Sequence, residues 1–87
     1  MEVIYSEKAL SHIAFWKKSG NLIIQKKIQQ LIEAIKIDFY NGIGKPEPLK
    51  HQLTGLWSRR INLEHRLIYQ LDEENKRIII HTLKGHY

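Results

Sequence analysis

A carboxylate and a histidine that could divide acid–base work stand at opposite ends of a basic stretch of the chain. Glu47 lies between Pro46 and Pro48, which hold it on a stiff, extended segment because proline restricts its own φ and the residue before it. His86 is the penultimate residue, and arginines lie between the two. This combination suits RNA cleavage by the ribose 2′-hydroxyl, which needs a base for that hydroxyl, an acid for the departing 5′-oxygen and cations around the phosphate.

The cations of this stretch are suited to a phosphate backbone. Arg60 and Arg66 offer the planar fork that binds two phosphate oxygens at once, and Lys50 and Arg59 add positive charge near them. The terminal Tyr87 could stack on a base, as aromatic side chains do with single-stranded RNA. Such a reaction requires no metal.

Each of these residues also has an ordinary structural interpretation. Glu47 could simply pair with Lys45 or Lys50 on a proline-rich surface loop. His86 and Tyr87 could be a frayed chain end, which is a common state of terminal residues. The arginines could be charges on the surface of strands, or an RNA-binding groove without a catalytic role.

Size and charge limit the kinds of protein that this chain can be. Its 87 residues predict one domain spanning 1–87. The net charge of +5 suits a polyanion such as nucleic acid or an acidic protein. The chain has no cysteine, which excludes disulfides and thiolate metal sites. His51, His65 and His81 show no metal-site spacing and are interpreted as structural or surface residues, so neither a metal nor another cofactor is expected.

The sequence shows no recognisable targeting or membrane segment. The opening Met1-Glu2-Val3 lacks the basic start of a signal peptide, and no apolar run approaches the roughly 18 residues that span a bilayer. We therefore expect a soluble, cytoplasmic protein with no membrane association.

Periodicity and capping residues predict two helices in the first half of the chain. Ser6 is a good N-cap, apolar residues then recur at helical spacing, and Gly20 and Asn21 end this helix and begin the next. The second helix is predicted from Leu22 to Ile37. The short turn between them predicts an antiparallel helical hairpin, on which His12 is expected to be a surface residue.

The remaining segments have β-strand character. Runs rich in β-branched and aromatic residues, bounded by turn residues, predict strands over 3–5, 57–61, 65–71 and 77–84. Their short connections predict antiparallel pairing. The expected fold is α+β, with an antiparallel sheet of about four strands, the element order β-α-α-β-β-β and the helical hairpin packed on one face.

Alternation of side chains along the strands predicts which residues can meet. If Trp57 and Ile61 face the helices, then Arg60 faces the other way, and the same alternation places Arg66 on the open face of the sheet. His86 could then join both arginines there. Alternation makes this convergence possible, but only the register between the strands establishes it.

Several ordered motifs resemble one family across essentially the whole chain. They are Gly-Lys-Pro-Glu-Pro-Leu-Lys-His (44–51), Gly-Leu-Trp-Ser-Arg-Arg-Ile (55–61), Glu-His-Arg-Leu-Ile-Tyr (64–69) and the terminal Gly-His-Tyr (85–87). These motifs and the chain length are similar to those of the YoeB (Txe) toxins of bacterial toxin–antitoxin systems, which belong to the RelE/ParE superfamily. The resemblance implies a RelE-like fold.

The resemblance also implies an activity and roles for individual residues. Proteins of this family are mRNA interferases, which cut messenger RNA in the ribosomal A site during translation. By motif position the resemblance assigns these roles: Glu47 as proposed general base, Arg66 as the phosphate-stabilising arginine, His86 as proposed general acid, Tyr87 as the aromatic residue that orders the substrate, and Lys50 and Arg60 as RNA contacts. On the residues alone, either Glu47 or His86 could be the base.

The partners that the resemblance implies are mRNA, the ribosome, a second copy of the toxin and an antitoxin. The antitoxin would be of YefM type, and its acidic C-terminal segment would cover or disturb the site. The toxin–antitoxin complex is expected to repress its own operon, with the antitoxin making the contacts to operator DNA.

Two other functions stay open on the sequence. A ParE-like toxin would inhibit DNA gyrase by binding, but it would have no reason to carry the complete set of Glu47, Arg66 and His86-Tyr87. A non-catalytic basic RNA-binding module would bind RNA in a salt-sensitive manner and yield no product.

Overall fold

The computed structural model describes residues 1–86, and Tyr87 lies outside the described residues. The helices and strands follow one another in this order: β1 (Glu2–Tyr5), α1 (Glu7–Ser19), α2 (Leu22–Ile37), β2 (Glu47–Pro48), the short 3₁₀-helix η1 (His51–Leu53), β3 (Trp57–Arg60), β4 (Arg66–Asp72) and β5 (Arg77–Thr82). Of the helices in residues 1–86, none has both the length and the apolar character that a bilayer-crossing segment requires.

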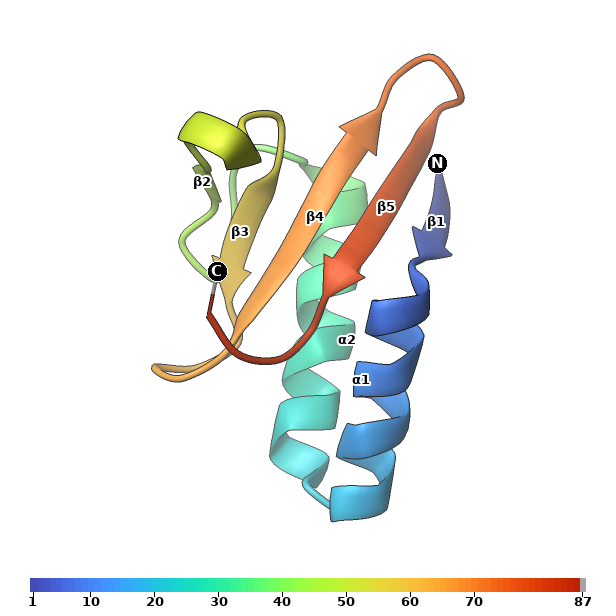
Figure 1. Ribbon diagram of the computed structural model, residues 1–87, viewed down its shortest axis with the longest axis vertical. Coiled ribbons are helices and arrows are strands. Elements are labelled where there is room, and N and C mark those ends of the chain that lie inside the picture. The colour runs from blue at the N-terminus through green and yellow to red at the C-terminus, as the bar shows by residue number, and fades with distance from the viewer. Residues whose placement is uncertain (87) are drawn as a thin grey trace.

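The five strands form one sheet in the order β1-β5-β4-β3-β2, with both helices on the same face (Figure 1). The predicted α+β fold with a helical hairpin on one face is therefore confirmed. The sheet differs from the expectation in two respects. β1 pairs with β5 in parallel, an arrangement that the short-connection argument does not cover because both helices and β2 to β4 lie between these strands in the chain. Glu47 and Pro48 add a fifth, edge strand opposite Ser58 and Trp57, a position where proline is tolerated.

The capping residues act as predicted. The Ser6 hydroxyl accepts a hydrogen bond from the Ala9 amide at 3.0 Å, and the Asn21 side chain accepts one from the Ile24 amide at 3.1 Å. Gly20 has φ +73 and closes α1 in the left-handed conformation that glycine adopts without strain. Local sequence therefore fixes both ends of the hairpin turn.

The core lies between the helices and one face of the sheet. Leu67 and Tyr69 of β4 and Ile78 and Ile80 of β5 are each at most 1% exposed. They pack with the buried stripe of α2: Ile24, Ile28, Leu31 and Ile35. The core face predicted for β4 is confirmed. In β5 Ile78 and Ile80 face the core, whereas strict alternation back from an open-face His86 would have placed them on the open face. β5 ends at Thr82, two residues earlier than predicted, and the next residue, Leu83, turns into the core.

Arg59 is fully buried on the core side of β3. Its Nε donates to the Tyr69 hydroxyl at 3.0 Å. Its two terminal nitrogens donate at 2.6–3.3 Å to backbone carbonyls of the loop after α2, those of Asp38, Phe39, Asn41 and Ile43. The prediction that Arg59 contacts RNA is therefore wrong. This guanidinium fixes the loop that leads from α2 to β2, because it satisfies carbonyls that have no partner in a regular element.

The role of Arg59 predicts a large stability loss on its replacement by methionine, which keeps the stem but removes every donor. Arg59→Met should lower the free energy of unfolding by about 2–4 kcal/mol, because three backbone carbonyls lose their Arg59 donor and the buried Tyr69 hydroxyl loses one of its two bonds. Urea titration followed by tryptophan fluorescence measures this value. Arg60→Met, the neighbouring change on the opposite face, should cost less than about 1 kcal/mol. Equal losses in the two variants would contradict this role of Arg59.

Candidate active site

Glu47 and Arg66 meet across two strands. The Glu47 carboxylate oxygen Oε1 lies 3.6 Å from Arg66 Nη1, and the two side chains are 49% and 17% exposed. Glu47 is opposite Ser58 in β3, and Arg60 of β3 is opposite Arg66 in β4, so all four side chains belong to the face of the sheet away from the helices. The carboxylate therefore reaches solvent while remaining against a cation.

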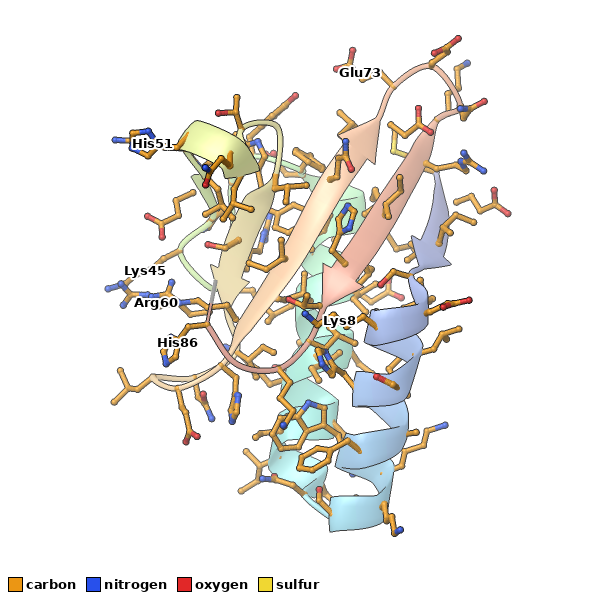
Figure 2. The ribbon with its side chains drawn as sticks, viewed as in Figure 1. Lys8, Lys45, His51, Arg60, Glu73 and His86 are labelled. Carbon is orange, nitrogen blue, oxygen red and sulfur yellow. The ribbon has the colours of Figure 1, made fainter. Side chains whose placement is uncertain are left out.

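Arg60 brings a second guanidinium beside the first. It is the register partner of Arg66, and its amide donates to the Gly44 carbonyl at 2.6 Å, which ties β3 to the segment that carries Glu47. The Nε of Arg60 is buried and has no hydrogen-bond partner among residues 1–86. Figure 2 shows Lys45, Arg60 and His86 on the same side of the molecule, near the end of β3. Positive charge is thus concentrated at this corner of the sheet.

His86 reaches this corner because the chain leaves β5 and crosses below β4 toward the end of β3 (Figure 1). The Arg66 amide donates to the Gly85 carbonyl at 2.9 Å, and Gly85 has φ +81, which favours glycine. The residue after Gly85 is His86, so its backbone follows directly on this hydrogen bond to Arg66. Alternation along a last strand predicted to run to residue 84 brought His86 to the open face. In the structure the strand ends at Thr82, and a turn through Gly85 brings the chain to Arg66 instead.

The remaining predicted site residues are distributed as follows. Lys50 is exposed and lines one shallow depression together with Glu47 and His51. Arg59 is in the core and does not belong to the site. Tyr87 lies outside the described residues. No three His, Asp or Glu side chains of residues 1–86 are grouped so that they could hold a metal ion.

The other histidines either occupy buried or partly buried, hydrogen-bonded positions or are exposed. His65 is 9% exposed, the His81 ring nitrogen Nε2 lies 2.9 Å from Gln70 Oε1, and His51 is exposed on η1. The structural or surface interpretation of these three is confirmed. His12 is not the simple surface residue that helical periodicity predicted, because its Nδ1 accepts a hydrogen bond from the Leu83 amide at 3.0 Å.

Known proteins share this fold. A solved YoeB/ParE toxin from Agrobacterium tumefaciens superposes with a TM-score of 0.95 at 33% identity, with both chains fully covered. The YoeB dimer from Staphylococcus aureus superposes with a TM-score of 0.88 at 39% identity, and a YoeB–YefM complex from the same organism with 0.88 at 40%. The two S. aureus matches each cover all of this chain and 98% of the solved chain. The architecture is that of a small bacterial toxin.

Sequence comparison identifies the family. The model of the YoeB-like toxin of bacterial type II toxin–antitoxin systems matches residues 5–87. Toxin YoeB of Escherichia coli K12 is 40% identical over the full length of both chains. The chain belongs to the YoeB-like family of type II toxins, as its motifs predicted.

The exposure of Glu47 predicts that its charge contributes little to the fold. Glu47→Gln should lower the free energy of unfolding by less than about 1 kcal/mol, since a half-exposed ion pair is largely screened by water. Gly44→Ala on the same segment is the positive control, because an added Cβ would lie 2.7 Å from Leu31 Cδ2 at a φ of +85. That change should cost about 1–3 kcal/mol. Losses of similar size would make Glu47 a structural residue.

Because His12 and His81 are partly buried, we expect the stability of the fold to depend on pH. Burial lowers the pKa of His81 below its ordinary value of 6.5, and burial, followed by the charges of Lys8 and Lys84, lowers the pKa of His12. The unfolded chain therefore binds protons more readily, and the free energy of unfolding should fall as pH drops below 6.5. Urea titrations between pH 7 and 5 should show a shallower fall for the variant His12→Asn/His81→Asn. If the free energy of unfolding fell equally with pH in the wild type and the variant, the lowered pKa values of His12 and His81 would be contradicted.

Proposed function

We propose that this chain is a ribosome-dependent endoribonuclease that cleaves mRNA in the A site and so inhibits translation. The observation that supports the proposal is the Glu47 carboxylate 3.6 Å from the Arg66 guanidinium, with Gly85, the residue before His86, bonded to the backbone of the same arginine. Membership of the YoeB-like toxin family supports it.

The chemistry follows from the three groups. Glu47 accepts the proton of the ribose 2′-hydroxyl, whose oxygen forms a bond to phosphorus while the bond from phosphorus to the 5′-oxygen breaks. His86 donates a proton to that departing oxygen, which leaves a cyclic 2′,3′-phosphate and a 5′-hydroxyl. Arg66 stabilises the charge that develops on the phosphate oxygens. This assignment of base and acid is the one that the resemblance implies.

The surrounding cations would hold the RNA. Arg60 presents a buried Nε that has no acceptor among residues 1–86, and Lys50 lies exposed beside the Glu47 segment. Both are suited to phosphate oxygens of the message. Tyr87 is proposed to stack on a base next to the scissile phosphate.

The same positive surface would bind an acidic partner, and a second copy of the chain is a further proposed partner. The S. aureus relative has been solved as a dimer and as a complex with YefM. We propose that this chain likewise forms a homodimer and binds a YefM-like antitoxin, whose acidic segment would compete with RNA for the cations. Operator DNA would be contacted through the antitoxin, and the toxin would act in the cytoplasm, where ribosomes translate.

Two other functions make different predictions. A gyrase-inhibiting toxin would leave mRNA intact and would stop gyrase from supercoiling DNA. A non-catalytic RNA-binding module would bind RNA without a product, and Glu47→Ala would then strengthen binding by removing a negative charge. The position of Glu47 against Arg66 favours the nuclease, because a carboxylate weakens a surface built only to bind phosphate.

In-vitro translation of a defined message, with primer extension to map cuts, tests the proposal. The wild-type protein should cut at A-site codons and only when ribosomes are present. Glu47→Ala, Arg66→Ala and His86→Ala should each lower the cleavage rate, the acid–base variants by about 10²–10⁴-fold. Lys18→Ala removes a positive charge from the exposed end of α1 and should cleave like the wild type.

Three results would count against the nuclease. Cleavage without ribosomes would contradict the proposal that the protein acts in the A site. Unchanged cleavage by all three variants would contradict the catalytic roles of Glu47, Arg66 and His86. An uncut message would direct attention to a gyrase supercoiling assay.

A further inference from the structure

The segment before His86 is fastened to α1 through one residue, Leu83. The Leu83 amide donates to His12 Nδ1 at 3.0 Å, and its carbonyl accepts from Trp16 Nε1 at 2.9 Å. His12 and Trp16 are four residues apart, so they lie one turn apart on the same face of α1. The helix therefore satisfies both backbone groups of Leu83 with two side chains.

A second residue, Gly85, is fastened in the same manner to the start of β4. Its amide donates to His65 Nδ1 at 2.8 Å, and its carbonyl accepts from the Arg66 amide at 2.9 Å. Two consecutive residues thus satisfy both backbone groups of Gly85. One of them, Arg66, belongs to the candidate active site, so the position of His86 is set directly relative to it.

Both imidazoles must be neutral to act in this way, because Nδ1 accepts a hydrogen bond only when it carries no proton. The proton then resides on Nε2. In His65 this nitrogen lies 3.6 Å from Glu64 Oε2. In His12 burial and the nearby Lys8 and Lys84 charges lower the pKa, which keeps the ring neutral.

The groups that hold the segment also pack against one another. The Trp16 ring meets the His65 ring edge to face, with centroids 4.9 Å apart. The Lys84 ammonium, between the two fastened residues, lies 4.4 Å from the centroid of the Phe15 ring. α1, β4 and the chain end therefore form one connected unit, although they are far apart in sequence.

We propose that His65, supported by His12 and Trp16, is a positioning residue that holds His86 in place for catalysis. The proposal rests on the proposed function, in which His86 is the acid. A terminal residue with an exposed side chain would ordinarily fray, whereas proton transfer requires the acid within about 2.6–3.2 Å of the leaving oxygen. The hydrogen bond from the Gly85 amide supplies this restraint one residue before the imidazole.

Two substitutions separate the hydrogen bond from the ring packing. His65→Asn places an oxygen acceptor near the position of Nδ1 but removes most of the ring contact with Trp16. His65→Phe keeps a ring against Trp16 but offers no acceptor. Urea unfolding of both variants identifies any general loss of stability, and hydrogen exchange of the Gly85 amide, followed by NMR, reports the bond directly.

The expected results differ between the two variants. Single-turnover cleavage of a defined message on programmed ribosomes should be slowed about 10²-fold in His65→Phe and by no more than about threefold in His65→Asn, because misplacement of a reacting group by about 1 Å has an effect of that size. The ribosome concentration at half-maximal rate should stay near the wild-type value in both, since the RNA-contacting cations are unchanged. Gly85 exchange should be at least about tenfold faster in His65→Phe than in the wild type.

Cleavage by His65→Phe at the wild-type rate, or equal Gly85 exchange in all three proteins, would overturn the positioning role while leaving the proposed function intact. Slow cleavage by His65→Asn with normal cleavage by His65→Phe would assign the effect to ring packing and would also overturn it. A message left uncut by the wild type would overturn the proposed function and, with it, the catalytic purpose of the restraint. The exchange rates would then still decide whether His65 holds the chain end.

Discussion

The buried guanidinium of Arg59 is the interaction on which the geometry of the candidate site depends. Taking a cation out of water costs several kcal/mol, and here backbone carbonyls and a tyrosine hydroxyl, rather than a salt bridge, offset that cost. The carbonyls come from the loop after α2, so the charge can be buried only when this loop is ordered. The loop continues to Gly44, whose carbonyl binds the Arg60 amide. The position of Glu47 therefore follows from a cation on the opposite face of β3.

Arg59 and Arg60 are neighbours in the sequence, yet one is a buried structural residue and the other belongs to the candidate site. Strict alternation from Trp57 and Ile61 places Arg59 among the core residues, yet a fully buried arginine is rare enough that a surface role was the reasonable expectation. What makes the burial possible is a set of backbone carbonyls in a distant loop, and side-chain chemistry in the sequence carries no signal of them. Arg60, on the other face, was placed correctly by the same alternation.

Local signals predicted most of the fold. Caps and helical periodicity predicted both helices, and alternation predicted the core face of β4. The parallel pairing of β1 and the two-residue strand β2 depend on contacts between distant segments, which leave little trace in local sequence. The path of the chain end was unpredictable for the same reason. One sequence feature did bear on this path: His12 and Trp16 are four residues apart on α1 and both bind the backbone of Leu83. Side-chain contacts of this kind can be recognised only once their backbone partner is known.

The arrangement of charges explains why this corner of the sheet should attract an anion. Arg60 and Arg66 are directly opposite each other on neighbouring strands, a placement that is unfavourable for like charges. Glu47, at 3.6 Å from Arg66, offsets part of this repulsion. A phosphate between the strands would offset it further, and so would the acidic segment of an antitoxin. If both anions bound at this place they would compete for it, and inhibition by an acidic partner would then need no second binding surface.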